Sequence, residues 1–169
     1  TSGTAAGLFN NITIQNNTIQ RAWYGIFAIA SVAAGNGTGL LIDNNNLNSS
    51  GSLAVRTGGI YLQGVEGATV SNNKIENLDQ GTQEIDRGIW LATGTNKTVV
   101  SNNTINNLGF TQALAFAPIG INITVGTGTT SADITVSNNN ITNLASDGTG
   151  HTIGINYSTS TFGVKILNN

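Results

Sequence analysis

The sequence has no cysteine, no methionine, one proline and few charges. Without cysteine it has neither a disulfide framework nor thiol chemistry. Charged residues make up 8% of its 169 residues, against roughly 25% in ordinary globular chains. Amphipathic helical bundles need charged faces, so this composition favours strands and turns. The net charge of −2 leaves no basic patch for a phosphate backbone, and we expect no nucleic-acid partner.

Long apolar runs are also missing. No run approaches the ~18 residues that a membrane-spanning helix needs, so we expect no membrane span. The chain does not begin with methionine and shows no signal peptide, and we interpret it as a processed or excised piece of a longer protein. Its length predicts one domain, residues 1–169, as a segment of a longer repeat array.

What the sequence has in abundance is glycine, with 22 residues, asparagine, with 25, and threonine, with 23. The stretch Ser71-Asn72-Asn73-Lys74-Ile75-Glu76-Asn77-Leu78 returns at 101–108 and at 137–144, with weaker copies at 15–19 and 43–47. The Asn pairs start at positions 16, 44, 72, 102, 138 and 168, in steps of 28, 28, 30, 36 and 30 residues. Such a period indicates a repeat architecture.

A second mark, Gly-Ile, recurs at 25–26, 59–60, 88–89, 120–121 and 154–155. Each period therefore holds three short segments, such as 68–71, 74–78 and 88–92, that alternate apolar and polar residues as half-buried strands do. Only the Asn pair separates the first two segments. A corner this tight needs a residue that tolerates left-handed backbone angles, which Asn does best after Gly. The sequence predicts an all-β parallel β-helix of about five coils with three strands per coil.

Apolar residues at equivalent positions predict four inward columns. They are Ile12/Leu40/Ala68/Thr98/Ile134, Ile14/Ile42/Val70/Val100/Val136, Ile19/Leu47/Ile75/Ile105/Ile141 and Ile26/Ile60/Ile89/Ile121/Ile155. The corner Asn side chains are expected to hydrogen-bond from coil to coil as a ladder. The corner residues are Asn16, Asn17, Asn44, Asn45, Asn72, Asn73, Asn102, Asn103, Asn138 and Asn139. We expect Asn103→Val to lose the turn geometry and a ladder hydrogen bond together.

The repeat, quoted as Thr69-Val70-Ser71-Asn72-Asn73-Lys74-Ile75-Glu76-Asn77-Leu78 with a later Gly88-Ile89-Trp90-Leu91, resembles right-handed parallel β-helices of the pectate-lyase-like superfamily. Similar Asn/Thr/Gly-rich arrays occur in large secreted bacterial surface proteins, phage tailspikes and polysaccharide-degrading enzymes. The resemblance implies an extracellular or cell-surface location. It leaves the function open, because one fold serves many functions.

If the Ile after each Gly points inward, the next residue points outward. These outward residues are Phe27, Tyr61, Trp90, Asn122 and Asn156. The three aromatics would then form an exposed stripe on adjacent coils. We consider two interpretations, a platform on which sugar rings stack, and a surface covered by loops or by another chain.

Lyases of the resembled superfamily use acidic calcium ligands with an Arg or Lys base, and its hydrolases use clustered Asp residues, on or beside this face. The outward positions here supply aromatic and amide side chains instead. Only Glu84, Asp86 and Arg87 cluster in sequence, and a solvated loop with a weak ion pair also explains them. His151 is the only histidine. We therefore assign no catalytic residue, no metal site and no cofactor.

The leading hypothesis is a non-catalytic extracellular structural or adhesive segment, such as a stalk, an adhesin or a self-assembling filament unit. The alternative is a pectate-lyase-like carbohydrate-binding or carbohydrate-active domain. No capping helix is recognisable at either end, and raw sheet edges pair with whatever fits. The expected partners are further coils of a parent chain or another copy, stacked end to end or side by side, with polysaccharide as the alternative.

Overall fold

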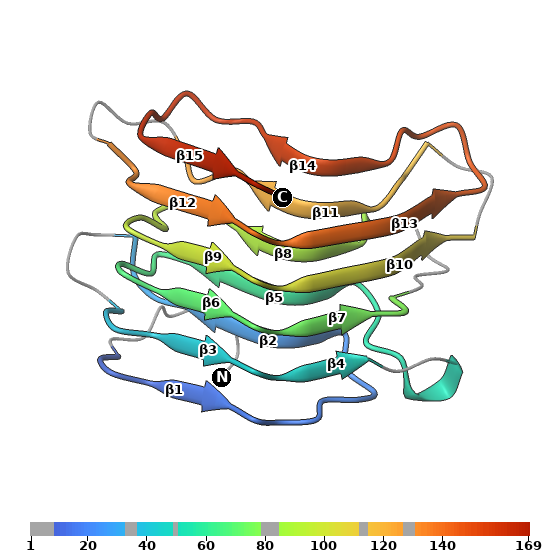
Figure 1. Ribbon diagram of the computed structural model, residues 1–169, viewed down its shortest axis with the longest axis horizontal. Coiled ribbons are helices and arrows are strands. Elements are labelled where there is room, and N and C mark those ends of the chain that lie inside the picture. Colours follow the sequence, from blue (N-terminus) through green and yellow to red (C-terminus); the bar gives the residue numbers. More distant parts are fainter. Residues whose placement is uncertain (1–8, 33–36, 49–50, 79–84, 112–114, 127–130) are drawn as a thin grey trace.

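The computed structural model describes residues 9–32, 37–48, 51–78, 85–111, 115–126 and 131–169. The chain winds through three parallel β-sheets and stacks its coils on top of one another (Figure 1). The helical content of the described residues is one 3-10 turn, η1(Gly51–Leu53). The predicted all-β parallel β-helix of about five coils is confirmed.

Within each sheet the strands follow chain order, and neighbouring strands come from successive coils. Sheet I consists of β1(Thr13–Gln15), β3(Leu41–Asp43), β6(Thr69–Ser71), β9(Val99–Ser101), β12(Ile134–Ser137) and β15(Val164–Leu167). Sheet II consists of β4(Asn46–Asn48), β7(Lys74–Glu76), β10(Thr104–Phe110) and β13(Asn140–Ser146). Sheet III consists of β2(Tyr24–Ile29), β5(Gly58–Gln63), β8(Arg87–Leu91), β11(Ile119–Ile123) and β14(Ile153–Tyr157).

The predicted inward columns form the core. In the middle coils their members are buried, as Ile42, Ile75 and Ile89 illustrate, and they belong to one continuous cluster. Members in the terminal coils are less covered. Ile12 is exposed and Ile155 only partly buried, because each coil buries its apolar face only against neighbours on both sides.

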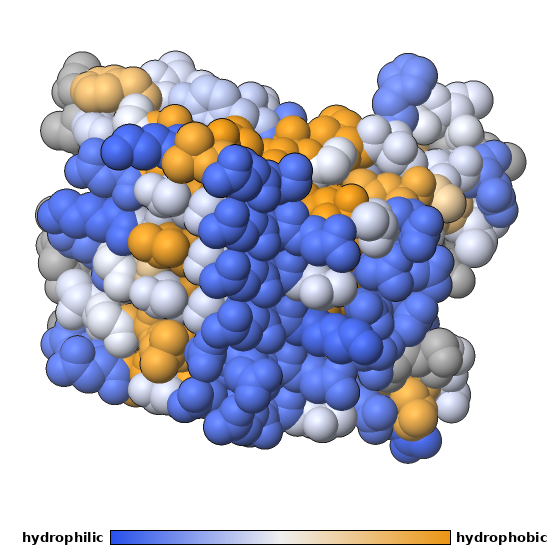
Figure 2. Space-filling model, in the orientation of Figure 1, coloured by the Kyte–Doolittle hydropathy of each residue, from blue (hydrophilic) through white to orange (hydrophobic). Residues whose placement is uncertain are grey.

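At the corner between sheets I and II the two Asn residues of each pair have different roles. The first residue is exposed and has a left-handed backbone, with φ between 51° and 59° at Asn16, Asn44, Asn72, Asn102 and Asn138. These exposed residues contribute to the hydrophilic column that runs along the molecule in Figure 2. The prediction of a left-handed Asn corner is thus confirmed.

The second Asn of each pair forms the ladder. Asn45, Asn73, Asn103 and Asn139 are buried, and each gives its backbone N–H and its Nδ2 to the Oδ1 of the next coil's Asn. The expectation that one residue, Asn103, carries both the turn geometry and the ladder bond is wrong, because the left-handed angle belongs to Asn102.

The recurring glycine of the Gly-Ile mark has a steric reason. A Cβ on Gly88 would lie 2.6 Å from the carbonyl oxygen of Gly120 and 2.7 Å from Cγ2 of Ile105. Gly25, Gly59 and Gly120 meet the same two obstacles, the next coil's glycine carbonyl and the apolar residue of sheet II. At these four positions of the column there is no room for a side chain where the backbone enters sheet III.

Candidate functional site

The candidate site is the outward stripe on sheet III. Strand pairing places its members side by side in the predicted order, Phe27 against Tyr61, Tyr61 against Trp90, Trp90 against Asn122 and Asn122 against Asn156. Their exposure differs from the expected open stripe. Phe27 is 52% exposed, whereas Tyr61 is 9% and Asn122 is 3% exposed.

The aromatic rings cover one another. The rings of Phe27 and Tyr61 are stacked, with centroids 4.7 Å apart and planes 16° apart. Trp90 meets Tyr61 edge-on at 4.9 Å, and Tyr24 tilts against Phe27 at 5.1 Å. Such pairs stabilise one another by about 0.5–1.5 kcal/mol beyond burial. The faces that a sugar ring would need are therefore occupied over much of the stripe.

Polar contacts fix the other half of the stripe. Trp90 donates from Nε1 to Oγ1 of Thr124 at 2.7 Å, and Arg87 places its Cζ 4.0 Å from the centre of the indole ring. Asn156 donates to Asn122 at 2.7 Å. In the opposite orientation of the Asn122 amide, which replaces this bond, its oxygen accepts from Nε of Arg87 at 3.1 Å and its nitrogen faces Asn156. The Asn122 amide thus lies between Asn156 and the Arg87–Trp90 cation–π pair.

Burial also affects the phenol of Tyr61. Desolvation, followed by the nearby Tyr24, raises the pKa of Tyr61 above its ordinary value, and the hydroxyl donates to Oε1 of Gln63 at 2.6 Å. A phenol held neutral in this way serves packing and hydrogen bonding.

The structure describes two residues of the Glu84, Asp86 and Arg87 cluster seen in the sequence. Asp86 is fully buried, whereas Arg87 reaches over Trp90 on the outer face of sheet III. Glu84 lies outside the described residues. Among the described residues, no three Asp, Glu or His side chains gather as a metal site would require.

A second amide ladder was not anticipated. Asn77 donates to Asn48 at 2.6 Å, Asn107 donates to Asn77 at 2.7 Å, and Asn143 donates to Asn106 at 2.8 Å. Asn77, Asn107 and Asn143 have left-handed backbones. Their recurrence in the motif, four residues after the ladder Asn, was the available signal. The two ladders therefore form two rows of amide side chains that run from coil to coil along sheet II.

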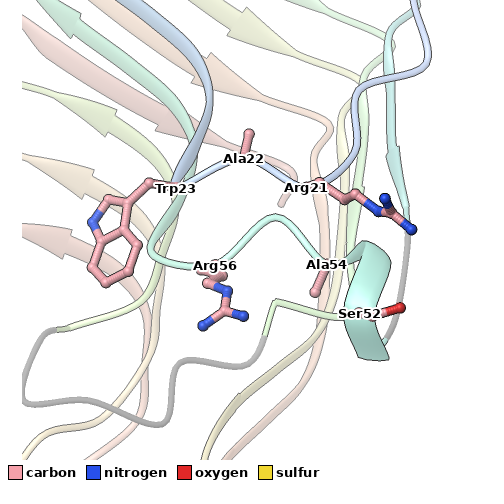
Figure 3. Close-up of a pocket in the computed structure, with 6 residues that line it drawn as sticks. All are labelled: Arg21, Ala22, Trp23, Ser52, Ala54 and Arg56. Atoms are coloured by element: carbon pink, nitrogen blue, oxygen red, sulfur yellow. The ribbon is translucent and has the colours of Figure 1, made fainter.

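The structure also shows a hollow that the sequence did not indicate. It has a volume of about 340 Å³ and is lined by Arg21, Ala22, Trp23, Ser52, Ala54 and Arg56. Trp23 is 46% exposed. Arg21 has a left-handed backbone, with φ 55°, and donates its N–H to the Leu53 carbonyl at 3.0 Å. The guanidinium groups of Arg21 and Arg56 point to different sides (Figure 3), so they do not converge on one anion.

The geometry defines a parallel β-solenoid whose outer side chains form continuous columns. The chain matches the family model described as "right handed beta helix region" over residues 4–169, so it belongs to the right-handed β-helix family, in agreement with the pectate-lyase-like resemblance. No curated protein and no solved structure matches the chain. No helix in the described segments is long and apolar enough to span a membrane.

Proposed function

We propose that this β-helix is a non-catalytic structural segment of an extracellular protein, serving as a stalk, an adhesin or a self-assembling surface unit. The observation that carries the proposal is that the outward side chains of sheet III contact one another. On the resembled enzymes this face holds acids and a base. Here Phe27, Tyr61 and Trp90 pack on one another, and Asn122 bonds to Asn156.

Continuous columns support a mechanical role. The buried Asn ladder and the apolar core link each coil to the next, and the packed aromatic stripe links the first three coils. Contacts between successive coils give a solenoid its stability. A segment built in this way holds its two ends at a fixed separation, as a stalk or spacer requires.

The test is incubation of the chain with a panel of neutral and acidic polysaccharides, followed by assays for new reducing ends and for unsaturated products. We expect no product above the level of a heat-unfolded control. Release of sugar that scales with the amount of folded chain would overturn the proposal.

A second candidate function is carbohydrate binding, which the exposed rings of Trp23 and Phe27 favour. Trp23 lines the hollow together with Arg56 (Figure 3), and exposed aromatic rings are the usual stacking surfaces for sugars. Tryptophan fluorescence during titration with the same polysaccharides tests it. A saturable shift that persists in Trp90→Phe and disappears in Trp23→Ala would support glycan binding at the hollow. No shift in the unmodified chain would reject it.

A further inference from the structure

The hollow near Trp23 lies where two successive coils pass from sheet II to sheet III. Its lining comes from residues 21–23 of one coil and residues 52–56 of the next (Figure 3). Backbone hydrogen bonds join the two connections, for example from the N–H of Arg56 to the Ala22 carbonyl at 3.0 Å. A further coil stacked before this pair would meet the other side of residues 21–23, so the hollow does not depend on where the chain begins.

The side chains around the hollow are rich in hydrogen-bond donors and poor in acceptors. Arg21 and Arg56 present guanidinium groups, which donate hydrogen bonds and cannot accept them. Ser52 supplies a hydroxyl, and no carboxylate or amide side chain is among the described residues that line the hollow. A sugar hydroxyl both donates and accepts, whereas an ionised carboxylate only accepts. The lining therefore favours a ligand that carries carboxylates over a neutral sugar.

Arginine gathers at this corner, although the chain has a net charge of −2. The three arginines of the sequence lie at or just before strands of sheet III in three successive coils, at positions 21, 56 and 87. Arg21 and Arg56 are exposed, whereas Arg87 packs over the Trp90 ring. Because the guanidinium groups of Arg21 and Arg56 point to different sides (Figure 3), they suit two carboxylates that lie apart, one for each guanidinium.

The rest of the lining is apolar. Ala22 and Ala54 contribute only methyl groups, and Trp23 is 46% exposed beside them. The volume of about 340 Å³ lies within the usual range of binding pockets. Tryptophan and arginine are the residues most enriched among the hot spots of protein interfaces. The hollow therefore offers one apolar side chain of a partner a place against the Trp23 indole, with a guanidinium group on each side.

We propose that the hollow binds an extended acidic segment of another protein. Alternate side chains of an extended segment point to one face, so the pattern acidic-x-apolar-x-acidic presents two carboxylates with an apolar side chain between them. The apolar side chain packs against Trp23, and the carboxylates pair with Arg21 and Arg56. The inference rests on the proposed function as an adhesin and names the chemical class of its partner.

Fluorescence anisotropy of a labelled synthetic peptide tests the proposal on the full chain. The probe is Glu-Ser-Leu-Ser-Glu with capped termini, and we expect saturable binding that weakens as the salt concentration rises. Two control peptides, Gln-Ser-Leu-Ser-Gln and Glu-Ser-Ser-Ser-Glu, lack the carboxylates or the apolar side chain and should bind about tenfold more weakly. Equal binding of all three peptides, or no saturable binding at about 1 mM probe, would overturn the proposal.

Substitutions locate the binding site. Arg21→Gln and Arg56→Gln each remove one exposed charge pair and should weaken binding roughly two- to fivefold, and Trp23→Ala should weaken it about tenfold or more. Lys165→Gln removes an exposed positive charge from sheet I and, as the matched control, should leave the affinity unchanged. Melting midpoints show that the variants fold. A Lys165→Gln loss equal to that of the arginine variants, or full binding by Trp23→Ala, would place the contact elsewhere and reject the proposal.

Competition decides between a protein partner and a glycan. Unlabelled peptide, alginate, which carries a carboxylate on every sugar, and neutral dextran are each added to the complex with the labelled peptide. We expect the unlabelled peptide to displace the probe at a lower carboxylate concentration than alginate, because alginate offers no apolar side chain to Trp23. Dextran should displace nothing. Displacement by dextran, or by alginate at the lower carboxylate concentration, would make the hollow a glycan site and overturn the proposal.

These outcomes are distinct from failure of the proposed function. A chain that binds no peptide and releases no sugar would still be a non-catalytic segment, whereas release of sugar would reject that function whether or not the peptide binds.

Discussion

Asn73 donates both its backbone N–H and its side-chain Nδ2 to a single atom, Oδ1 of Asn103, at 2.9 and 3.0 Å. Asn103 does the same to Asn139, at 3.0 and 2.9 Å, and also gives Nδ2 to the Val70 carbonyl at 3.0 Å. One buried amide therefore satisfies polar groups in three coils. The neighbouring Asn102 is exposed and supplies the backbone angle.

Removing a central ladder amide should be costly. Asn103→Ala would leave two donors of Asn73 and the Val70 carbonyl without their partner in a buried corner. Unsatisfied buried groups destabilise by about 1–3 kcal/mol each, with some relief from relaxation, so we expect a total loss of roughly 2–4 kcal/mol. Urea unfolding followed by circular dichroism measures it, and a loss below about 1 kcal/mol would contradict the ladder's role.

Substitutions of Asn102 should affect stability through the backbone conformation that they allow at this position. Asn102→Gly keeps access to the left-handed region at φ 56° and should change the unfolding free energy little. Asn102→Val forces a β-branched residue into that region and should cost about 1–3 kcal/mol. The same unfolding experiment compares the two variants. Equal losses would show that the Asn102 side chain, not its φ, matters.

The glycine column predicts a position-dependent effect of one methyl group. Gly88→Ala would place Cβ 2.6 Å from a backbone carbonyl, and overpacking of this kind typically costs about 1–3 kcal/mol or more. Gly154→Ala occupies the equivalent position in the last coil, where a Cβ meets nothing within 4 Å. Melting midpoints of the two variants at low protein concentration should therefore differ, with only Gly88→Ala lowered.

Asp43 should contribute to stability in a pH-dependent way. Hydrogen bonds from Ser71 first, then Asn72 and Gln15, lower the pKa of Asp43 below its ordinary value of 3.8. Around that pH the unfolded chain binds more protons than the folded chain, so the unfolding free energy falls as the pH falls through the lowered folded pKa.

Unfolding titrations between neutral pH and the acid range check this prediction. Ser71→Ala removes the largest cause of the shift and should shrink the acid-dependent loss, and Asp43→Asn should abolish this residue's share of it. Acid curves that coincide for all three chains would contradict the assignment.

The sequence predicted the fold because its signals were redundant. The Asn pairs, the Gly-Ile dipeptides and the alternation of apolar and polar residues all repeat with one period. Each coil is therefore an independent copy of the same pattern. The columns led by Ile42, Ile75 and Ile89 were identifiable in this way. The different roles of Asn102 and Asn103 could not be predicted, because the two residues have the same side chain and differ only in backbone conformation.

The surface was less predictable. The alternation of apolar and polar residues correctly placed Tyr61 and Asn122 on the outward face of sheet III. An outward side chain can still be buried, because neighbouring strands lie about 4.8 Å apart and their side chains cover one another. The hollow near Trp23 joins two segments some thirty residues apart in sequence, and its residues Arg21, Ser52 and Arg56 belong to the parts of the coil that repeat least. Periodicity carries no information about such positions.

The ladder that connects Asn17 to Asn169 runs in one sense only, with each Oδ1 accepting from the preceding coil. The amide dipoles of this column therefore add instead of cancelling, and neighbouring amides polarise one another. The end that carries Asn169 is the positive pole and the end that carries Asn17 the negative pole. Every coil added to such a rod lengthens one aligned row of dipoles, so this solenoid is electrically directional even though its repeat is nearly uniform.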